Sequence, residues 1–312
     1  MFPDISGKGV FIWHPSQICK GDPERIADEA ERAGVVHACV KIMDGIWNYA
    51  KKGENPIATV KALRRRGIRV SGWGGIYCKW YPKLEAQTVA DAIDYFEPEF
   101  FLIDAEDGAK YQFNGARAFT NEFSRLKPMF PMGMCSYWYP PYHQELPWKE
   151  FRTICHFDAP QVYWRGWDPV GKLQKSKKVY AAMTPRLPYL FAGGDLYFEN
   201  NVKPTPTQVT MFLEACRDDP EIKGVLMWAM DQNETTPELW KAFSDFEWNV
   251  EKAIFKSEMH GFFQDATKEY DAQEDVYYAM YTGHKSAGTL PDPTDRDHED
   301  LAVVAGVRKI LS

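Results

Sequence analysis

Residues 100–107 read Phe-Phe-Leu-Ile-Asp-Ala-Glu-Asp (FFLIDAED), four apolar residues followed at once by acids. A short apolar run of this kind is typical of a strand buried on both faces of a parallel sheet. Asp104 and Glu106 stand two apart, so on a strand their side chains leave the same face with Cα atoms roughly 6.5–7 Å apart. The segment therefore predicts two neighbouring carboxylates at the carboxyl end of a buried strand.

The same alternation of a short apolar run and a helical segment occurs eight times between residues 9 and 246. The predicted strands cover residues 9–14, 36–42, 68–77, 100–106, 130–136, 158–164, 187–192 and 224–230. The predicted helices begin at Asp22-Pro23 and then cover residues 56–66, 82–96, 116–126, 148–152, 170–182, 207–217 and 236–246. A (β/α)8 barrel typically takes roughly 250 residues. The chain is therefore predicted to be an α/β protein with a (β/α)8 TIM-barrel fold.

A doubly wound parallel sheet is the main competing fold. It would normally carry a glycine-rich phosphate-binding turn after the first strand. Here the first predicted strand ends in His14-Pro15-Ser16-Gln17, which has no glycine. The barrel is therefore favoured, and we expect no cofactor.

The sequence predicts two regions. Residues 1–249 form the barrel, and residues 250–312 form a short helical C-terminal extension with a Gly-, Pro- and Asp-rich linker near residues 283–297. The extension is too small to predict an independent core. It could pack on the barrel, contact a partner protein or join the chain to a larger assembly.

Charge and cysteine usage exclude several classes of protein. The net charge is −7, and only residues 61–69 are locally basic, so a nucleic-acid partner is not expected. The six cysteines are far apart and show no CxxC pairing, which argues against a disulfide framework or zinc site. No apolar run reaches the ~18 residues of a membrane span, and no signal segment precedes residue 10, so synthesis in the cytoplasm is expected.

Active sites of such barrels gather at the carboxyl ends of the strands. At these ends the sequence places acidic and aromatic side chains, which suit a sugar-binding site. The candidate substrate-binding residues are Lys41, Trp73, Tyr77, Tyr137, Gln161, Tyr163, Trp228 and Asp231. For the aromatic residues among them, filling the core is an equally good explanation. Lys41 could equally be a surface lysine, and Asp231 could simply begin the next helix.

Asp104 and Glu106 are the candidate catalytic residues. Two like charges this close raise at least one pKa and favour a protonated acid at neutral pH. Such an acid can donate its proton to a glycosidic oxygen while its neighbour supports the positive charge that develops. The alternative is a pair of solvated loop acids that cap the next helix. A catalytic metal is not expected, because no second histidine accompanies His14 at a useful spacing.

Four short motifs resemble those of glycoside hydrolase family 25 lysozymes (muramidases), over residues 9–246. They are residues 41–45 (KIMDG), which resemble a K-A-T-E/D-G strand end; 75–77 (GIY), a G-x-Y turn; 104–106 (DAE), the catalytic D-x-E; and 135–138 (CSYW), an aromatic strand end. One position departs from that family. Where family 25 usually has an aspartate on the first strand, this sequence has Phe11 or Trp13.

A second resemblance is to family 18 chitinase-like barrels. Residues 71–75 (SGWGG) are similar to an S-x-G-G third strand, residues 161–163 (QVY) to a Q/M-x-Y sixth strand, and Trp228 to a terminal tryptophan. The longer acidic signature of that family is absent, because apolar residues 100–103 precede Asp104. Both resemblances imply that Glu106 is the acid and that Asp104 assists a substrate N-acetyl group acting as the internal nucleophile.

The expected function is therefore hydrolysis of a β-linked amino-sugar polysaccharide, above all bacterial peptidoglycan. An envelope hydrolase without a signal segment would act after lysis or as a virion component, so a phage setting is expected. Two alternatives stay open. One is a non-catalytic glycan-binding or virion or envelope structural protein on a TIM-barrel scaffold, and the other is a glycosidase that acts on a non-amino sugar.

Overall fold

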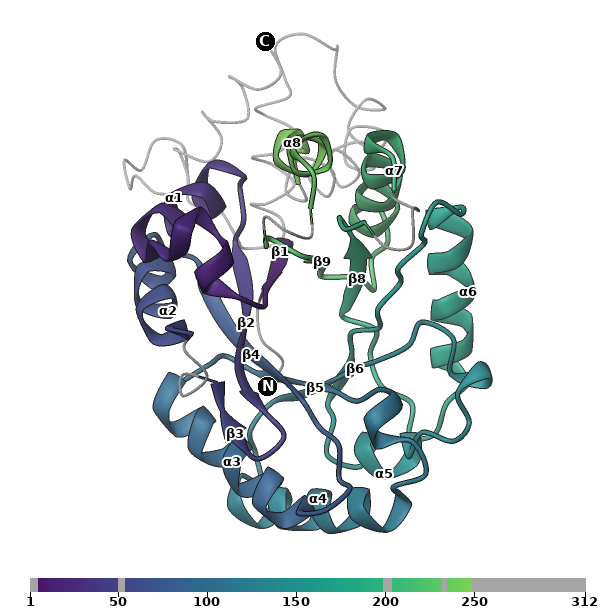
Figure 1. Cartoon of the computed structure of the whole chain (residues 1–312). Helices are drawn as coiled ribbons and strands as arrows, with labels where there is room; N and C mark the ends of the chain where they lie inside the picture. The colour runs from purple at the N-terminus through teal and green to yellow at the C-terminus, as the bar shows by residue number, and fades with distance from the viewer. Residues whose placement is uncertain (1–4, 50–53, 199–203, 232–234, 249–312) are drawn as a thin grey trace, which may run out of the picture. The chain divides into compact units, whose positions relative to one another are not determined.

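The computed structural model describes residues 5–49, 54–198, 204–231 and 235–248. These residues belong to one compact unit that ends at Trp248. Within it, eight parallel strands lie inside a surrounding ring of helices (Figure 1). The predicted α/β class and (β/α)8 fold are confirmed. The extension predicted for residues 250–312 lies outside the described residues.

The strands follow one another around the barrel in chain order, and the first pairs with the last. They are β1 (Gly7–Ile12), β2 (His37–Asp44), β4 (Arg69–Gly75), β5 (Phe101–Asp104), β6 (Met132–Cys135), β7 (Phe157–Asp158), β8 (Phe191–Asp195) and β9 (Gly224–Trp228). Strand β1 pairs in parallel with β2 on one side and with β9 on the other. Between β7 and β8, the N–H of Leu190 donates to the Asp158 carbonyl at 3.1 Å and that of Gly193 to the Pro160 carbonyl at 2.8 Å. These bonds close the barrel.

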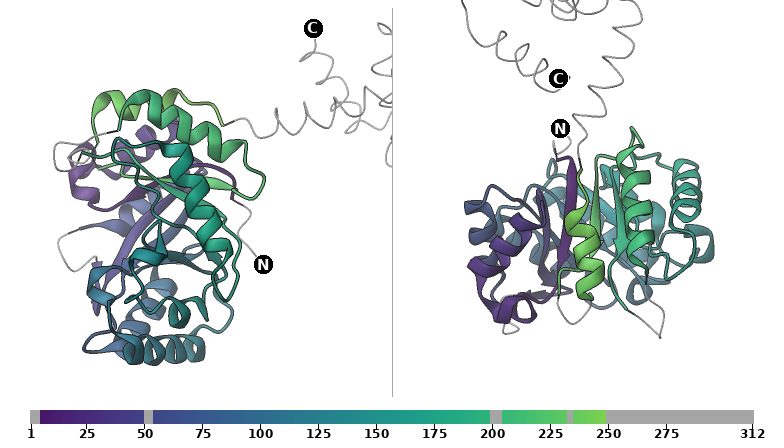
Figure 2. Two further views of the ribbon diagram at one scale, coloured as in Figure 1. Left: turned by 90° about the vertical axis from the view of Figure 1, so that its right-hand side faces the viewer. Right: turned by 90° about the horizontal axis from the view of Figure 1, so that it is seen from above.

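Helices lie outside the strands, as Figure 2 shows from two further sides. They are α1 (Pro23–Arg32), α2 (Pro56–Arg65), α3 (Pro82–Phe96), α4 (Phe113–Leu126), α5 (Trp148–Arg152), α6 (Pro169–Ala181), α7 (Pro206–Arg217) and α8 (Pro237–Asp245). Most begin with proline, whose missing N–H costs nothing in the first turn. Asp22 and Asp168 cap α1 and α6 by accepting backbone N–H bonds. None of the helices in these described ranges is both long and apolar enough to cross a membrane.

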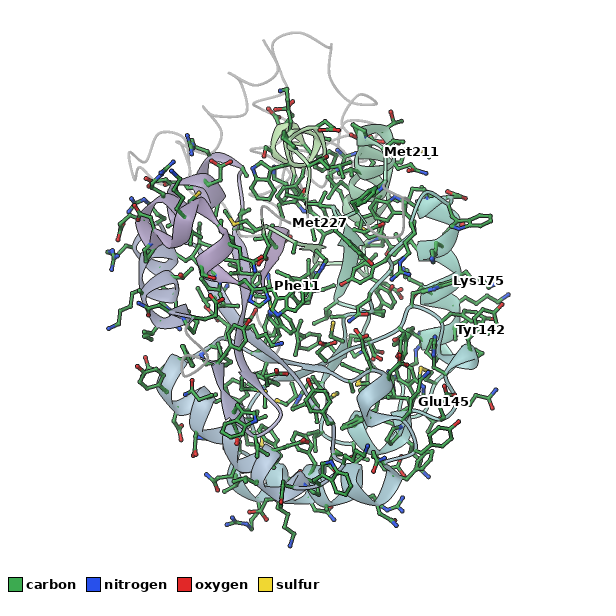
Figure 3. All side chains as sticks on the ribbon, viewed as in Figure 1. Phe11, Tyr142, Glu145, Lys175, Met211 and Met227 are labelled. Atoms are coloured by element: carbon green, nitrogen blue, oxygen red, sulfur yellow. The ribbon has the colours of Figure 1, made fainter. Side chains whose placement is uncertain are left out.

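Aromatic side chains fill the inside of the barrel. Phe100 stacks on Phe191 at 5.4 Å between ring centroids and meets Phe157 edge-on at 5.2 Å. Phe11 lies near the centre of the ring of elements in Figure 3, in the same cluster of buried residues as Trp73. A filled interior means that a ligand site can lie only at an end of the barrel.

The structure differs most from the predicted elements in three places. A two-residue strand, β3 (Trp47–Asn48), pairs with the end of β2. Strand β7 ends at Asp158, although Gln161 still bridges to Tyr137. Strand β8 begins and ends later than predicted and includes Gly193 and Gly194.

Packing explains why two glycines lie in a strand. A Cβ atom on Gly194 would lie 2.6 Å from the Met227 sulfur and from the Phe212 ring. A Cβ atom on Gly193 would lie 3.0 Å from the Pro160 carbonyl oxygen. The glycines therefore mark close packing inside the barrel wall, whereas from sequence they resemble a turn.

Lys8 connects the first strand to the last helix. Its side chain is buried, and its ammonium group donates to the carbonyls of Phe243, Ser244 and Phe246 at 2.9, 3.0 and 2.7 Å. These carbonyls belong to the C-terminal end of α8, where backbone acceptors lack helical partners. A cation at this end also complements the helix dipole.

Candidate active site

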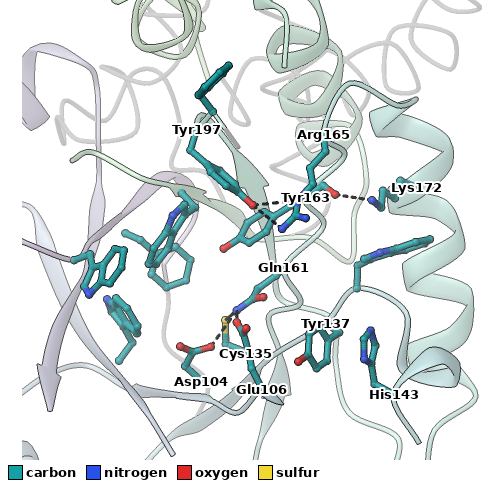
Figure 4. Close-up of a pocket in the computed structure, with 16 residues that line it drawn as sticks. Asp104, Glu106, Cys135, Tyr137, His143, Gln161, Tyr163, Arg165, Lys172 and Tyr197 are labelled. Carbon is teal, nitrogen blue, oxygen red and sulfur yellow. Dashed lines mark hydrogen bonds between the residues drawn. The ribbon is translucent and has the colours of Figure 1, made fainter. Parts of the chain in front are cut away.

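A cavity of about 560 Å³ opens at the carboxyl ends of the strands (Figure 4). Side chains from helix α6 and from seven of the eight strand ends or the loops after them, all except β2, line it. They are Phe11, Trp13, Trp73, Asp104, Glu106, Cys135, Tyr137, Trp138, His143, Gln161, Tyr163, Arg165, Lys172, Tyr197, Phe198 and Trp228. The location is the one in which (β/α)8 enzymes carry their chemistry.

Asp104 and Glu106 lie together in this cavity. A single amide group, the Nε2 of Gln161, donates to Asp104 Oδ1 at 3.0 Å and to Glu106 Oε1 at 2.7 Å. The two side chains therefore both reach Gln161, although β5 ends at Asp104 and Glu106 lies two residues beyond the strand rather than on it as predicted. Neither carboxylate caps a helix, since the N-cap of α4 is Gln112 and Glu106 makes no side-chain cap bond to the short turn at 107–109. The helix-capping alternative is wrong.

The backbone fixes Gln161 on both sides. Its N–H donates to the Ser136 carbonyl at 2.9 Å, and it forms parallel bridges to Tyr137 and to Gly193. Gln161 is thus held between the ends of β6 and β8. Because its backbone is already fixed, little further conformational entropy is lost when its amide group bonds both acids.

Asp104 is positioned to hold a proton. Burial raises the pKa of its carboxyl group well above the usual range, the neighbouring Glu106 raises it further, and the Lys41 ammonium group partly offsets both effects. Burial and a neighbouring acid therefore favour the protonated form of the Asp104 carboxyl group. The pair is therefore ready for acid–base chemistry.

Lys41 is buried and is not among the residues that line the cavity. Its Nζ lies 4.8 Å from the centre of the Trp73 ring, 5.2 Å from that of Tyr49 and 5.6 Å from that of Trp13. It also lies 3.6 Å from Asp44 Oδ1. The aromatic faces stabilise a buried cation, and this cation acts on Asp104 through its charge.

Four aromatic rings form one wall of the cavity. Trp228 lies 5.5 Å from Phe11, 5.5 Å from Trp13 and 5.3 Å from Trp73, measured between ring centroids. Phe11 and Trp13 occupy the strand-one positions where a family 25 lysozyme would have an aspartate, so this wall is apolar. Flat rings of this kind pack on the apolar faces of sugar rings.

On another side of the cavity, Tyr137 and His143 stack closely. Their ring centroids are 3.6 Å apart with an interplanar angle of 11°. The Tyr137 hydroxyl donates to Asp107 at 2.6 Å, and Lys110 contacts Asp107 at 2.9 Å. The third acid of the segment therefore holds the loop rather than joining the carboxylate pair.

Two cations line the far side of the cavity. Lys172 Nζ donates to the Tyr163 carbonyl at 2.6 Å, and the Arg165 guanidinium group donates to the Tyr197 hydroxyl at 3.1 and 3.3 Å. Figure 4 places Arg165 and Lys172 across the cavity from Asp104 and Glu106.

Of the eight predicted substrate-binding residues, five line the cavity. They are Trp73, Tyr137, Gln161, Tyr163 and Trp228. The other three are placed differently. Lys41 is buried among aromatic rings as described, and Tyr77 is exposed with its hydroxyl donating to Asp44 at 2.7 Å. Asp231 is fully buried, and its carboxylate accepts the N–H groups of Trp13 and His14 at 3.1 and 2.6 Å.

Nine residues that line the cavity were not among the predicted site residues. Five of them lie beyond the strand ends, on loops or on helix α6, where periodicity carries no signal: His143, Arg165, Lys172, Tyr197 and Phe198. The other four lie within or shortly after the predicted strands 9–14 and 130–136 and were therefore detectable in principle: Phe11, Trp13, Cys135 and Trp138.

Comparisons with known proteins identify the fold. No protein-family model matches the sequence, and no curated protein matches it. Among solved structures, active domain 2 of a thermostable chitinase from Pyrococcus furiosus is similar, with a TM-score of 0.58 and 12% identity over 81% of this chain and 98% of that one. A family 18 chitinase from Pseudoalteromonas aurantia gives a TM-score of 0.52 and 13% identity over 81% and 99%.

The Bacillus cereus spore cortex-lytic enzyme SleL is also similar, with a TM-score of 0.53 and 10% identity over 78% of this chain and 75% of that one. These likenesses are to barrels of glycoside hydrolases and give no specific support to family 25. At such identities they establish the barrel fold, and the argument for a function rests on the site.

Proposed function

We propose that this protein is a glycosidase that cleaves a β-linked amino-sugar glycan, with Glu106 as general acid and Asp104 as its partner. The observation that carries the proposal is the pair of carboxylates that share the Gln161 amide in an aromatic-lined cavity. The named structural neighbours, two chitinases and a spore cortex-lytic enzyme, support the amino-sugar class, and the last supports peptidoglycan as the polymer.

The arrangement of acids favours a substrate-assisted route. A retaining enzyme with a carboxylate nucleophile needs a second acid about 5–5.5 Å from the first, on the other side of the glycosidic bond. Among the described residues that line the cavity, the only carboxylates are Asp104 and Glu106, which leave one strand end together. The nucleophile in the proposal is therefore the carbonyl oxygen of the substrate's N-acetyl group.

The proposed reaction has two steps, which are joined by an intermediate in which the N-acetyl oxygen is bonded to the anomeric carbon. The N-acetyl oxygen forms a bond to the anomeric carbon, the bond from that carbon to the glycosidic oxygen breaks, and Glu106 gives its proton to the leaving oxygen. Asp104 stabilises the positive charge on the N-acetyl nitrogen. Glu106 then takes a proton from a water molecule whose oxygen forms a bond to the anomeric carbon, while the bond from that carbon to the N-acetyl oxygen breaks. This restores the N-acetyl group and releases the sugar.

The test is turnover of purified peptidoglycan and of chitin oligosaccharides by the Glu106→Gln variant. We expect no release of reducing ends from either polymer, with the folded structure retained. Asp91→Asn on the exposed face of α3 is the matched control, because it removes one negative charge far from the cavity. Full activity of Glu106→Gln would end the proposal.

A second candidate function is glycan binding without turnover. Two observations support it. Buried Leu102 stands before the Asp104–Glu106 pair, where a longer acidic motif would have a further acid. Phe11 and Trp13 occupy the end of the first strand, where an aspartate would be expected. Calorimetric titration with the same oligosaccharides separates the two. Binding by the unaltered protein without turnover, and equal affinity after Glu106→Gln, would favour the binding protein.

A further inference from the structure

One ring of the cavity wall stacks on a histidine that lies outside the cavity. Trp13 lines the cavity, and the His14 imidazole ring stacks on its indole ring with centroids 4.3 Å apart and an interplanar angle of 29°. His14 itself is not among the lining residues. We propose that the His14–Glu54 pair positions the Trp13 ring, so that glycan binding depends on the charge of His14. The role in glycan binding rests on the proposed function, whereas the coupling of the two rings does not.

One acid holds the backbone of both residues. The buried carboxylate of Asp231 accepts the N–H of Trp13 at 3.1 Å and the N–H of His14 at 2.6 Å. With the backbone fixed in this way, the two rings can change their orientation only through their side-chain torsions. The contacts of the imidazole ring therefore decide how firmly the indole ring is held.

Two oxygens meet the same nitrogen of that imidazole ring. His14 Nδ1 lies 2.7 Å from the Tyr49 hydroxyl oxygen and 3.2 Å from Glu54 Oε1. With a lone pair, this nitrogen accepts the Tyr49 proton, whereas with a proton it donates to the Glu54 carboxylate. Glu54 also accepts the backbone N–H of Ser16 at 2.9 Å and its hydroxyl at 2.7 Å, so the carboxylate is held independently of His14.

Several charged or titratable groups lie around the two stacked rings. They are Tyr49 on β3, Glu54 before α2, Asp231 after β9, and Lys41 and Asp44 on β2. The acids attract a charged imidazole ring, and Lys41, at 3.6 Å from Asp44, opposes them. Histidine is the side chain whose charge ordinarily changes between about pH 5 and pH 8. Acidification across that range therefore places a positive charge against the Trp13 ring.

That charge strengthens the contact between the rings. A cation on the face of an indole ring is attracted by it, and Glu54 receives the proton on His14 Nδ1. An indole ring that is already fixed loses less conformational entropy when a sugar packs on it. We expect glycan affinity to be about two- to fivefold higher when His14 is charged, the size of a cation–π contact at an exposed site.

The first test follows the Trp13 ring without a glycan. Its fluorescence, taken as the difference between the unaltered protein and Trp13→Phe, is measured from about pH 8 to about pH 5. We expect quenching at low pH, because a charged imidazole ring in contact with an indole ring withdraws electron density from its excited state. His14→Gln should abolish the transition, and Glu54→Gln, which keeps an acceptor for Ser16, should move its midpoint to lower pH.

His156→Gln is the matched control, because it makes the same substitution directly before β7, at the amino ends of the strands. It should leave the fluorescence transition unchanged. A difference signal with no transition in the unaltered protein would overturn the proposal. A transition that His14→Gln does not alter would overturn it as well.

The second test measures the affinity for a chitin oligosaccharide by calorimetry at about pH 5.5 and pH 7.5. The ratio of the two affinities should be about two- to fivefold larger in the unaltered protein than in His14→Gln, a comparison that removes the effect of other titrating groups. Equal ratios in a protein that shows the fluorescence transition would overturn the role in binding. Absence of glycan binding at either pH would end the proposed function and this role together, while the fluorescence still decides whether His14 controls the ring.

Discussion

The acids near the carboxyl end of β5 differ from those near the carboxyl ends of β8 and β9 in the groups that their oxygens contact. Asp195 accepts two consecutive backbone N–H groups, from Trp164 and Arg165. Asp231 repeats the arrangement with Trp13 and His14. Asp104 and Glu106 instead meet at the side-chain amide of Gln161 and open into the cavity.

The difference separates acids that hold the barrel from acids that can react. Asp195 and Asp231 each tie the end of one strand to the segment that follows another, with the backbone as partner. Burial raises the pKa of Asp195 to about 6, and the two N–H groups oppose that shift. At Asp104 the neighbouring acid reinforces the effect of burial. Location at a strand end is therefore insufficient to identify a catalytic acid. The groups that its carboxylate oxygens contact show whether the acid has a structural or a catalytic role.

Glu106→Gln is expected to have the greatest consequence for activity and little for stability. Loss of a general acid typically lowers kcat by about 10²–10⁴-fold. Because Gln161 can still bond an amide oxygen, the free energy of unfolding should change by about 1 kcal/mol or less. Steady-state kinetics and urea unfolding of the same preparation check both parts, and a strongly destabilised variant would show that Glu106 belongs with the structural acids.

Asp195→Ala and Asp231→Ala should behave in the opposite way. Each removes the acceptors of two backbone N–H groups in a buried or partly buried setting, so we expect a loss of about 2–4 kcal/mol in unfolding free energy. Urea unfolding measures the loss. Near-wild-type stability with abolished turnover would instead assign these two acids to the chemistry.

The pH dependence of kcat/KM should respond to two variants at the β5 side. The basic limb reports loss of the proton whose binding is favoured by the raised pKa of Asp104. Asp104→Asn removes this group, so its contribution to the limb should be lost. Lys41→Met removes a charge that lowers the pKa of Asp104, so the limb should shift to higher pH. An unchanged limb in both variants would contradict the coupling.

The smallest effect expected is a pH-dependent stability difference for Asp104→Asn. Because the pKa of Asp104 is raised in the folded protein, the folded state binds more protons than the unfolded chain above the unfolded pKa of about 3.9. The contribution of Asp104 to the free energy of unfolding is therefore complete below pH about 3.9 and is lost as the pH rises through the pKa that Asp104 has in the folded protein. Asparagine does not titrate, so the variant does not lose this contribution. Its free energy of unfolding relative to that of the unaltered protein should therefore be greater at pH 7 than at pH 4, as measured by urea unfolding.

The fold was predictable because each unit carries its own signals. Apolar runs such as residues 100–103 identify buried strands, and prolines such as Pro23 and Pro82 identify helix starts. The departures have local physical causes. Strand β3 is only two residues long, and Gly193 and Gly194 are required by close contacts with residues distant in the sequence. The pattern of apolar and polar residues along the sequence does not show contacts between residues that are distant in the chain.

The site was predictable to the extent that strand ends supply it. The sequence places Asp104, Gln161 and Trp228 in the site because the carboxyl ends of parallel strands meet at one end of the barrel. Lys172 does not, because it reaches the cavity from α6, and Arg165 lies in a loop where its backbone adopts a φ of 47°. The placement of Asp231 failed for another reason, since sequence cannot show that backbone N–H groups occupy its oxygens.

The bonds made by Lys8 also bear on how the chain folds as it is made. Its ammonium group joins carbonyls 235 to 238 residues later, and β1 pairs with β9. Contacts this far apart in sequence require a large loop to close and are typical of slow folding. During synthesis, the edge of β1 that pairs with β9 stays unpaired until Gly224 has left the ribosome. The bond from Lys8 to the Phe246 carbonyl likewise cannot form until Phe246 has been made. The first strand to be made is thus among the last to be completed, and for that interval its free edge can pair with another chain.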